Sequence, residues 1–189
     1  MPQELNKQDR QILLKIAREA LEKSVRFEPL PEIKIKELPL TLQDYGASFV
    51  TLTIDNSLRG CIGTLEAYLP LAEDVQQHTA AAALQDNRFP NVQPEECSKI
   101  LIEISVLSPK AQLEYDQPHE LTEKLRPGKD GVVLQDGFRK ATFLPQVWAK
   151  LPDPHHFLSH LCLKMGSSGD LWQEKPLQVY TYQVQEFHE

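Results

Sequence analysis

The order in which strand-like and helix-like segments follow one another limits the fold most strongly. Residues 49–54 and 58–65 are β-branched runs on either side of a short polar turn, and residues 132–135 and 138–143 flank Asp136-Gly137. Such pairs predict β-hairpins. Helix-like segments lie between the hairpins instead of alternating regularly with single strands. We therefore predict an α+β fold, with a mainly antiparallel sheet packed against helices.

The remaining segments fit the same architecture. Apolar residues recur at helical spacing, or good helix formers follow a proline, in residues 5–27, 70–85, 118–125 and 154–165. Residues 100–107 and 177–187 have the composition of strands. Three prolines predict an extended connector over residues 29–39.

Composition is that of a globular protein. The chain has 189 residues, of which 41% are hydrophobic and 25% charged, so one domain spanning residues 1–189 is expected. A formal net charge of -7 opposes non-specific binding to nucleic acid or anionic membrane, so no DNA partner is expected.

Cysteine content and the N-terminal sequence predict the compartment. The three cysteines, Cys61, Cys97 and Cys162, are few, odd in number and without metal-type spacing. The first ten residues are polar and charged, unlike a secretory signal, and no apolar run approaches the ~18 residues that a membrane span needs. We therefore expect a cytoplasmic protein with no membrane partner.

The segment Leu58-Arg-Gly-Cys-Ile-Gly63, called the hexapeptide below, is the most informative for function. Strand side chains alternate between faces, so Leu58, Gly60 and Ile62 share one face in this prediction, and Arg59, Cys61 and Gly63 share the other. The aliphatic face would meet the helices. Two glycines would let a ligand or a second backbone approach closely.

Arg59 and Cys61 allow two interpretations. A guanidinium beside a thiol favours the thiolate, which is the nucleophilic form, so the pair could form a reactive group in an anion-attracting recess. Alternatively, Cys61 is buried and inert, and Arg59 forms a structural ion pair. The pattern alone leaves both interpretations open.

The hexapeptide resembles the signature of the AMMECR domain family. The resemblance extends in the same order over most of the chain, through residues 64–66, 70–71, 86–90, 102–107, 128–131 and 141–145 and Trp148. The compact length resembles the stand-alone prokaryotic members called AmmeMemoRadiSam system protein A. The resemblance implies an α+β fold with a larger lobe and a smaller β-containing lobe, and a cleft lined by the hexapeptide. It also implies association with a Memo-like protein and a radical SAM protein, and it implies no particular reaction.

Two further candidate residues lie outside the hexapeptide. Glu103 sits among apolar neighbours in the strand 100–107, where a carboxylate must be paired, exposed at a cleft or shifted in pKa. It could be a general base or ligand-orienting acid, or a structural partner of an arginine. Arg88 could be a second anion contact held by Asp86, as the family resemblance favours, or the two could only pin the loop.

Metal and cofactor sites are not predicted. His156 and His160 share one flank of a helix with His155 nearby, but spacing places no third ligand. Residues 126–131 are glycine-rich but lack the spacing of a phosphate-binding loop.

These observations favour an enzyme or enzyme component. Cys61 would be the reactive group, Glu103 the proton acceptor, Arg59 and Arg88 the anion contacts, and Gly60 and Gly63 the access. The substrate could be a small molecule, a peptide or RNA. The alternative is a non-catalytic module that binds an anionic ligand, RNA or a partner protein in the same cleft.

Overall fold

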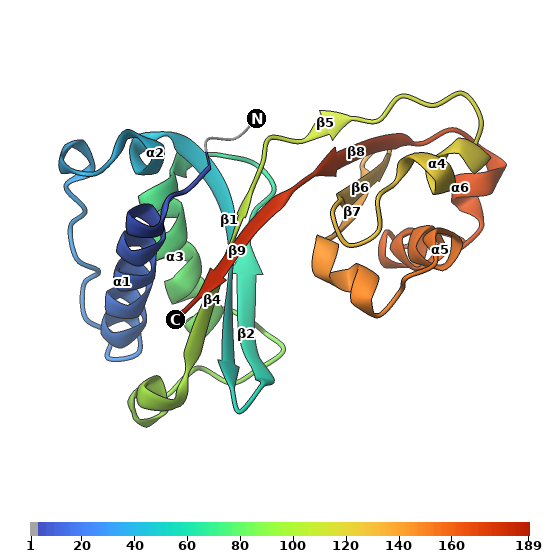
Figure 1. Ribbon diagram of the computed structural model, residues 1–189. Coiled ribbons are helices and arrows are strands. Elements are labelled where there is room, and N and C mark those ends of the chain that lie inside the picture. Colours follow the sequence, from blue (N-terminus) through green and yellow to red (C-terminus); the bar gives the residue numbers. More distant parts are fainter. Residues whose placement is uncertain (1–3) are drawn as a thin grey trace. The chain divides into compact units, whose positions relative to one another are not determined.

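The computed structural model describes residues 4–189 and confirms the α+β architecture (Figure 1). The chain divides into two units. Unit 1 comprises the described residues up to Leu107 together with Gln185–Glu189, and unit 2 comprises Ser108–Val184. Unit 2 is thus inserted between two strands of unit 1. The predicted cleft between the two lobes stays a prediction.

Unit 1 is built on an antiparallel sheet. Its strands are β1 (Tyr45–Ile54), β2 (Ser57–Gly63), β4 (Leu101–Leu107) and β9 (Val184–His188), in the order β2-β1-β4-β9, and the short β3 (Leu69–Pro70) pairs with the start of β1. The β1–β2 hairpin turns at Asp55 and Asn56, which both have positive φ, a conformation that these two residue types tolerate. Among the described strands, β2 comes first in the strand order and pairs only with β1, so it is an edge strand.

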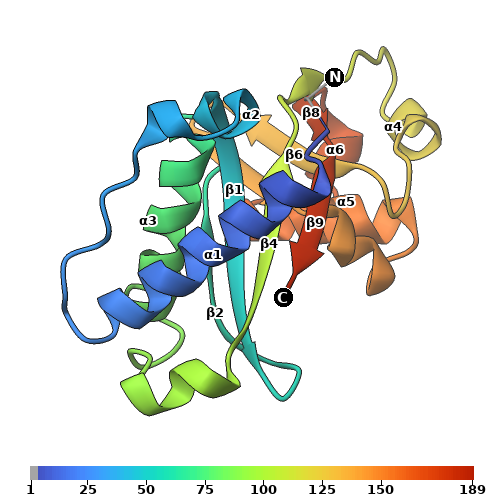
Figure 2. The ribbon, with the colours of Figure 1, turned by 60° about the vertical axis from the view of Figure 1, so that its left-hand side comes forward.

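Helices cover one face of this sheet. α1 (Lys7–Ser24) and α3 (Leu71–Leu84) lie on the same side, as Figure 2 shows. Alternation along the strands sends one set of apolar side chains toward these helices, and these side chains join one core with those of the helices. The set comprises Val50, Leu52, Ile102, Ile104 and Val106. Phe49, Thr51, Thr53, Leu101 and Glu103 alternate with them and lie on the other face, called the helix-free face below.

Local signals fix the ends of the helices of unit 1. Asn6 caps α1, because its side chain accepts hydrogen bonds from the backbone N–H groups of Gln8 and Asp9, and Asp9 accepts one from the backbone of Asn6. Glu73 and Asp74 lie in the first turn of α3, where carboxylates suit the helix dipole. The connector between α1 and β1 contains η1 (Ile35–Glu37) and α2 (Leu40–Gln43), two short turns that the prediction missed.

Unit 2 has a sheet and core of its own. The strands β5 (Ala111–Gln112), β6 (Gly131–Asp136), β7 (Arg139–Phe143) and β8 (Gln178–Tyr182) form an antiparallel sheet in the order β5-β8-β6-β7. The helical segments are α4 (His119–Lys124), η3 (Pro145–Ala149), α5 (Pro154–Lys164) and α6 (Leu171–Glu174). Trp148 stacks on Phe157 with ring centroids 3.6 Å apart, and Trp172 is buried in the same cluster.

The prediction of one strand over residues 177–187 is wrong. Residues 177–187 form two strands, because β8 pairs within unit 2 and β9 pairs within unit 1, with Gln183 between them. Alternation of side chains is identical in one long strand and in two collinear short ones, so the pattern could not reveal the break. η2 (Pro94–Lys99), in the loop before β4, was also not predicted.

Candidate functional site

A β-bulge changes the orientation of the first half of the hexapeptide. Gly60 pairs with Leu52 and Leu58 pairs with Thr53, so Arg59 is the extra residue of β2 at this point. Cross-strand partners lie on the same face, so Leu58 falls on the helix-free face with Thr53, and its side chain is 41% exposed. The predicted placement of Leu58 beside Gly60 and Ile62 is therefore wrong.

Both glycines of the hexapeptide make room for the protein itself. A Cβ atom on Gly60 would lie 2.1 Å from the carbonyl oxygen of Ala82 in α3, and one on Gly63 would lie 2.4 Å from the ring of Phe49. Each is closer than real Cβ contacts allow. The close approach at Gly60 is that of a second backbone, one of the two options that the sequence left open.

Arg59 is fully engaged within unit 1. Its Nε and Nη2 donate to the two carboxylate oxygens of Glu96 at 2.8 and 2.9 Å, and Nη1 and Nη2 donate to the carbonyls of Pro90 and Asn91 at 2.7 and 3.1 Å. The side chain is 14% exposed. Arg59 also lowers the pKa of Glu96 by hydrogen bonding to it. The charge of Arg59 is thus balanced by η2 and the loop before it.

Cys61 is half-buried, a free thiol on the helix-free face. Its Sγ accepts a hydrogen bond from Oγ1 of Thr51, the cross-strand partner, at 3.3 Å. Because β2 is an edge strand, the backbone groups of Cys61 turned away from β1 would otherwise be unpaired. Asp86 accepts from the N–H of Cys61 at 2.8 Å, and Nη2 of Arg88 donates to its carbonyl at 3.2 Å.

Asp86 and Arg88 form a hydrogen-bonded pair that binds both free backbone groups of Cys61, and this pair is called the bracket below. Nε and Nη2 of Arg88 donate to the two oxygens of Asp86 at 2.9 and 2.7 Å. The Asp86 side chain is 5% exposed, whereas that of Arg88 is 58% exposed. The hydrogen bonds from Arg88 hold the pKa of Asp86 far below its usual range. The same hydrogen bonds raise the pKa of Arg88, and the Cys61 side chain adds to this increase. The guanidinium of Arg88 thus contacts the backbone of Cys61 and interacts with its thiol, while more than half of the Arg88 side chain is exposed.

Glu103 lies in the same cross-strand row as Cys61. Thr51 pairs with Cys61 on one side and with Glu103 on the other. Two strand spacings of about 4.8 Å put the backbones of Cys61 and Glu103 roughly 10 Å apart. Burial raises the pKa of Glu103, the neighbouring Glu186 raises it further, and His188 opposes the shift. Glu186 and His188 are exposed residues of β9.

The structure brings some of the predicted site residues together and separates others. Cys61 and Arg88 are adjacent, Glu103 is in the same row beyond Thr51, and Arg59 is bound elsewhere. The hydrogen bond from Thr51 to the thiol was not predicted from the sequence. Thr51 lies on the same face as Cys61 by alternation, but the register that makes the two residues partners is not visible in either strand alone.

A second polar cluster of unit 1 is structural. The buried Asp74 accepts a hydrogen bond from Ser48 Oγ at 2.6 Å, and His78 Nδ1 lies 3.1 Å from the same carboxylate oxygen, so this group ties α3 to β1. Within residues 4–189, no group of three or more His, Cys, Asp or Glu side chains is placed to hold a metal ion. No helix in the described part of the chain is long and apolar enough to cross a membrane.

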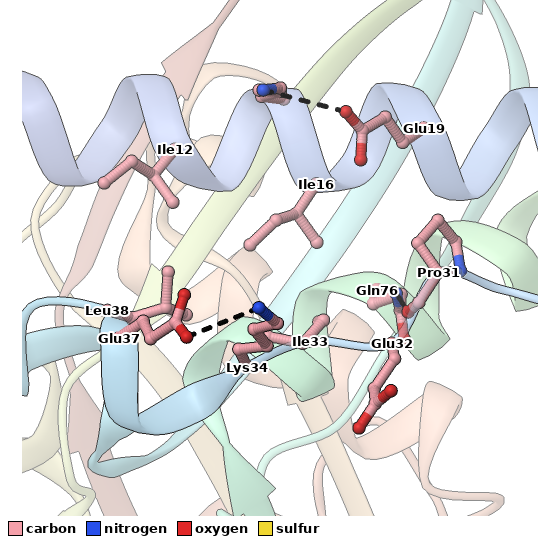
Figure 3. A pocket seen from close by; sticks show the side chains of 11 residues that line it. Ile12, Ile16, Glu19, Pro31, Glu32, Ile33, Lys34, Glu37, Leu38 and Gln76 are labelled. Atoms are coloured by element: carbon pink, nitrogen blue, oxygen red, sulfur yellow. Dashed lines mark hydrogen bonds and ion pairs between the residues drawn. The ribbon is translucent and has the colours of Figure 1, made fainter.

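A cavity of about 390 Å³ lies between α1 and the connector that follows it (Figure 3). Its apolar wall includes Ile12 and Ile16 of α1 and Ile33 and Leu38 of the connector, and no residue of the hexapeptide lines it. The lysines of its rim form ion pairs with neighbouring glutamates, Lys15 with Glu19 and Lys34 with Glu37. The cavity is thus separate from the candidate site.

Comparisons with known proteins match nearly the whole chain. A family model described as AMMECR1 matches residues 14–187. Protein MJ0810 of Methanocaldococcus jannaschii is 36% identical over 84% of this chain and 80% of its own length. A protein of Thermofilum pendens is 35% identical over 98% of this chain and 92% of its own length. The crystal structure of the uncharacterized protein PH0010 from Pyrococcus horikoshii superposes with a TM-score of 0.86 at 33% identity, covering 94% of this chain and 89% of that one.

Proposed function

Because this chain belongs to the AMMECR1 family, whose name states no reaction, we propose its function from its own geometry: an enzyme or enzyme component that uses Cys61 as its reacting group. Arg88 would be the contact for an anionic group of the substrate. Thr51 would hold the thiol, and Glu103 would accept a proton from the bound substrate or return one to it.

The observation that carries this proposal is the half-buried thiol of Cys61 beside an exposed guanidinium. Asp86 holds Arg88 in place through its side chain and also binds the backbone of Cys61. The surroundings of Cys61 therefore differ from those of the other two cysteines. Cys97 and Cys162 illustrate the contrast, since they are 8% and 0% exposed and burial raises the pKa of both thiols.

Alkylation with a neutral and an anionic reagent tests the proposal. We expect iodoacetamide to modify Cys61 in the native protein well before Cys97 and Cys162, as read by peptide mass analysis. Iodoacetate carries a carboxylate that Arg88 would attract. Arg88→Gln should therefore lower the rate with iodoacetate about three- to tenfold more than the rate with iodoacetamide.

Arg26→Gln is the matched control, because Arg26 is an exposed arginine beyond the end of α1. It should leave the ratio of the two rates unchanged. If Cys61 resists both reagents in the folded protein, or if Arg88→Gln changes both rates equally, the proposed role of the pair is wrong.

A binding module without chemistry is the second candidate. It is favoured by the packing roles of Gly60, Gly63 and Arg59, which use half of the hexapeptide for structure. Complementation in cells that lack the gene separates the two candidates. Cys61→Ser would abolish function in an enzyme but would leave it intact in a binding module, whereas Arg88→Gln would impair both.

We propose a Memo-like protein and a radical SAM protein as partners and the cytoplasm as the location, on the family resemblance and on three cysteines that are all free. Co-purification from cells with a tagged chain, followed by mass analysis of what remains bound, tests the partners. Fractionation of the same cells tests the location. Direct RNA binding has less support, because unit 1 holds 18 acidic residues against 11 lysines and arginines.

A further inference from the structure

The helix-free face of unit 1 has a definite pattern of charge and apolar surface. At the outer edge of β2 lies the exposed guanidinium of Arg88. On β4 and β9 lie the carboxyl groups of Glu103 and Glu186. Burial and the neighbouring Glu186 raise the pKa of Glu103, and His188 of β9 opposes the shift. A guanidinium therefore lies at one side of the sheet and carboxyl groups lie at the other.

An apolar row runs beside this charged row. Leu58 and Leu101 both pair with Thr53, so the three side chains lie next to one another across β2, β1 and β4. Leu58 and Leu101 are 41% and 51% exposed, unlike the buried leucines on the helix face. Thr53 is two residues from Thr51, so the apolar row is about 7 Å from the row of Cys61.

Distance and charge together define the occupant. Cys61, which lies next to Arg88, and Glu103 are about 10 Å apart. An extended peptide advances about 3.3–3.6 Å per residue, so about three residues connect the two ends. A carboxylate would meet Arg88, an ammonium group would meet Glu103, and aliphatic side chains would cover Leu58 and Leu101.

We propose that this face binds a short aliphatic peptide with both termini free, oriented with its carboxylate at Arg88 beside Cys61 and its amine at Glu103. This inference rests on the proposed function for the location of the site, and it names the substrate class. Small anions that need only Arg88, such as phosphate, are the competing occupants.

Trileucine is the probe, with N-acetyl-trileucine and trileucine amide as matched analogues that each lack one charge. Binding to the full chain is measured by isothermal titration calorimetry and by protection of Cys61 from iodoacetamide. We expect trileucine to bind and protect, and each analogue to bind about tenfold more weakly, as expected for the loss of one hydrogen bond between charged groups.

Two variants assign each end of the peptide. Glu103→Gln should remove the difference between trileucine and its N-acetyl analogue but keep the difference from the amide. Arg88→Gln should do the reverse, and Arg88→Lys, which keeps the charge if the glutamine variant folds poorly, should still discriminate against the amide. Glu22→Gln and Arg26→Gln, at exposed positions in and after α1, are the controls and should change neither difference.

The inference is overturned if all three peptides bind equally, if none binds, or if inorganic phosphate protects Cys61 as well as trileucine does. Failure here is distinguishable from failure of the proposed function. Ready alkylation of Cys61 with no binding of peptide would reject only the substrate class. Binding of trileucine with an unreactive Cys61 would reject the chemistry and keep the binding site.

Discussion

At the scale of single residues, Gly60 shows how closely the hexapeptide is fitted to α3. The carbonyl of Ala82 occupies the space that any side chain at this position would need. Backbone atoms of a helix cannot move aside as the tip of a flexible side chain can. The absence of a side chain at position 60 is therefore a requirement of the sheet–helix packing.

Gly60→Ala should lower the free energy of unfolding by about 2–3 kcal/mol, the upper part of the usual range for overpacking. Urea denaturation followed by far-UV circular dichroism measures it. Gly169→Ala is the control, since its Cβ would meet only ordinary contacts at 3.7 Å. Neutral surface substitutions usually change the free energy of unfolding by less than about 0.5 kcal/mol. A change that small for both variants would show that α3 can move away from β2.

Asp86 should make stability depend on pH. Arg88 and the N–H of Cys61 hold the pKa of Asp86 far below the ordinary aspartate value of about 3.9. A carboxylate with a depressed pKa stabilises the fold fully above its unfolded pKa, and this contribution is lost as the pH falls toward its folded pKa.

Asp86→Asn should therefore lower the free energy of unfolding by about 2–3 kcal/mol at pH 7. The difference from the natural protein should shrink steadily below about pH 4. Urea denaturation at several pH values between 3 and 7 tests this. Asp55→Asn, at the exposed hairpin turn, is the control and should show no such trend. A deficit independent of pH would mean that the carboxylate charge has no part in the bracket.

At the scale of elements, local sequence signals predicted most of unit 1 and unit 2. α1, α3, α5 and both hairpins lie where periodicity, prolines and Asp136-Gly137 indicate. The two misses in the strands share a cause. The bulge at Arg59 and the break at Gln183 depend on which strand pairs with which, and a single strand does not encode its partner.

The same reason limits what could be foreseen of the site. Cys61 and Arg88 could be proposed from the hexapeptide and the loop that follows α3. Arg59 could not be assigned to Glu96, because η2 is more than 30 residues away and reaches it only through the fold. The row of Cys61, Thr51 and Glu103 likewise exists only once the register is known.

The capping box of α1 offers a test at this scale. Asn6→Ala removes the side-chain oxygen that accepts the N–H groups of Gln8 and Asp9, so the free energy of unfolding should fall by about 1 kcal/mol. Gln11→Ala, at an exposed interior position of α1, is the control and should be neutral or slightly stabilising. Thermal or urea unfolding reads both, and equal effects would mean that α1 does not need its cap.

At the scale of the whole molecule, each unit has its own core, and both tryptophans belong to unit 2. Tryptophan fluorescence therefore reports on unit 2, while far-UV circular dichroism reports on both units. We expect Gly60→Ala to move the midpoint seen by circular dichroism and to leave the fluorescence midpoint in place. Coincident shifts by both probes would show that the two units unfold as one cooperative system.

The insertion of unit 2 between β4 and β9 also sets the order in which the chain is made. β9 is translated only after residues 108–183, so the side of β4 that it later covers has no partner while those residues emerge. At about 5–20 residues per second, this lasts roughly four to fifteen seconds on the ribosome. During that interval nascent unit 1 presents an open strand edge, the kind of surface that chaperones shield from aggregation.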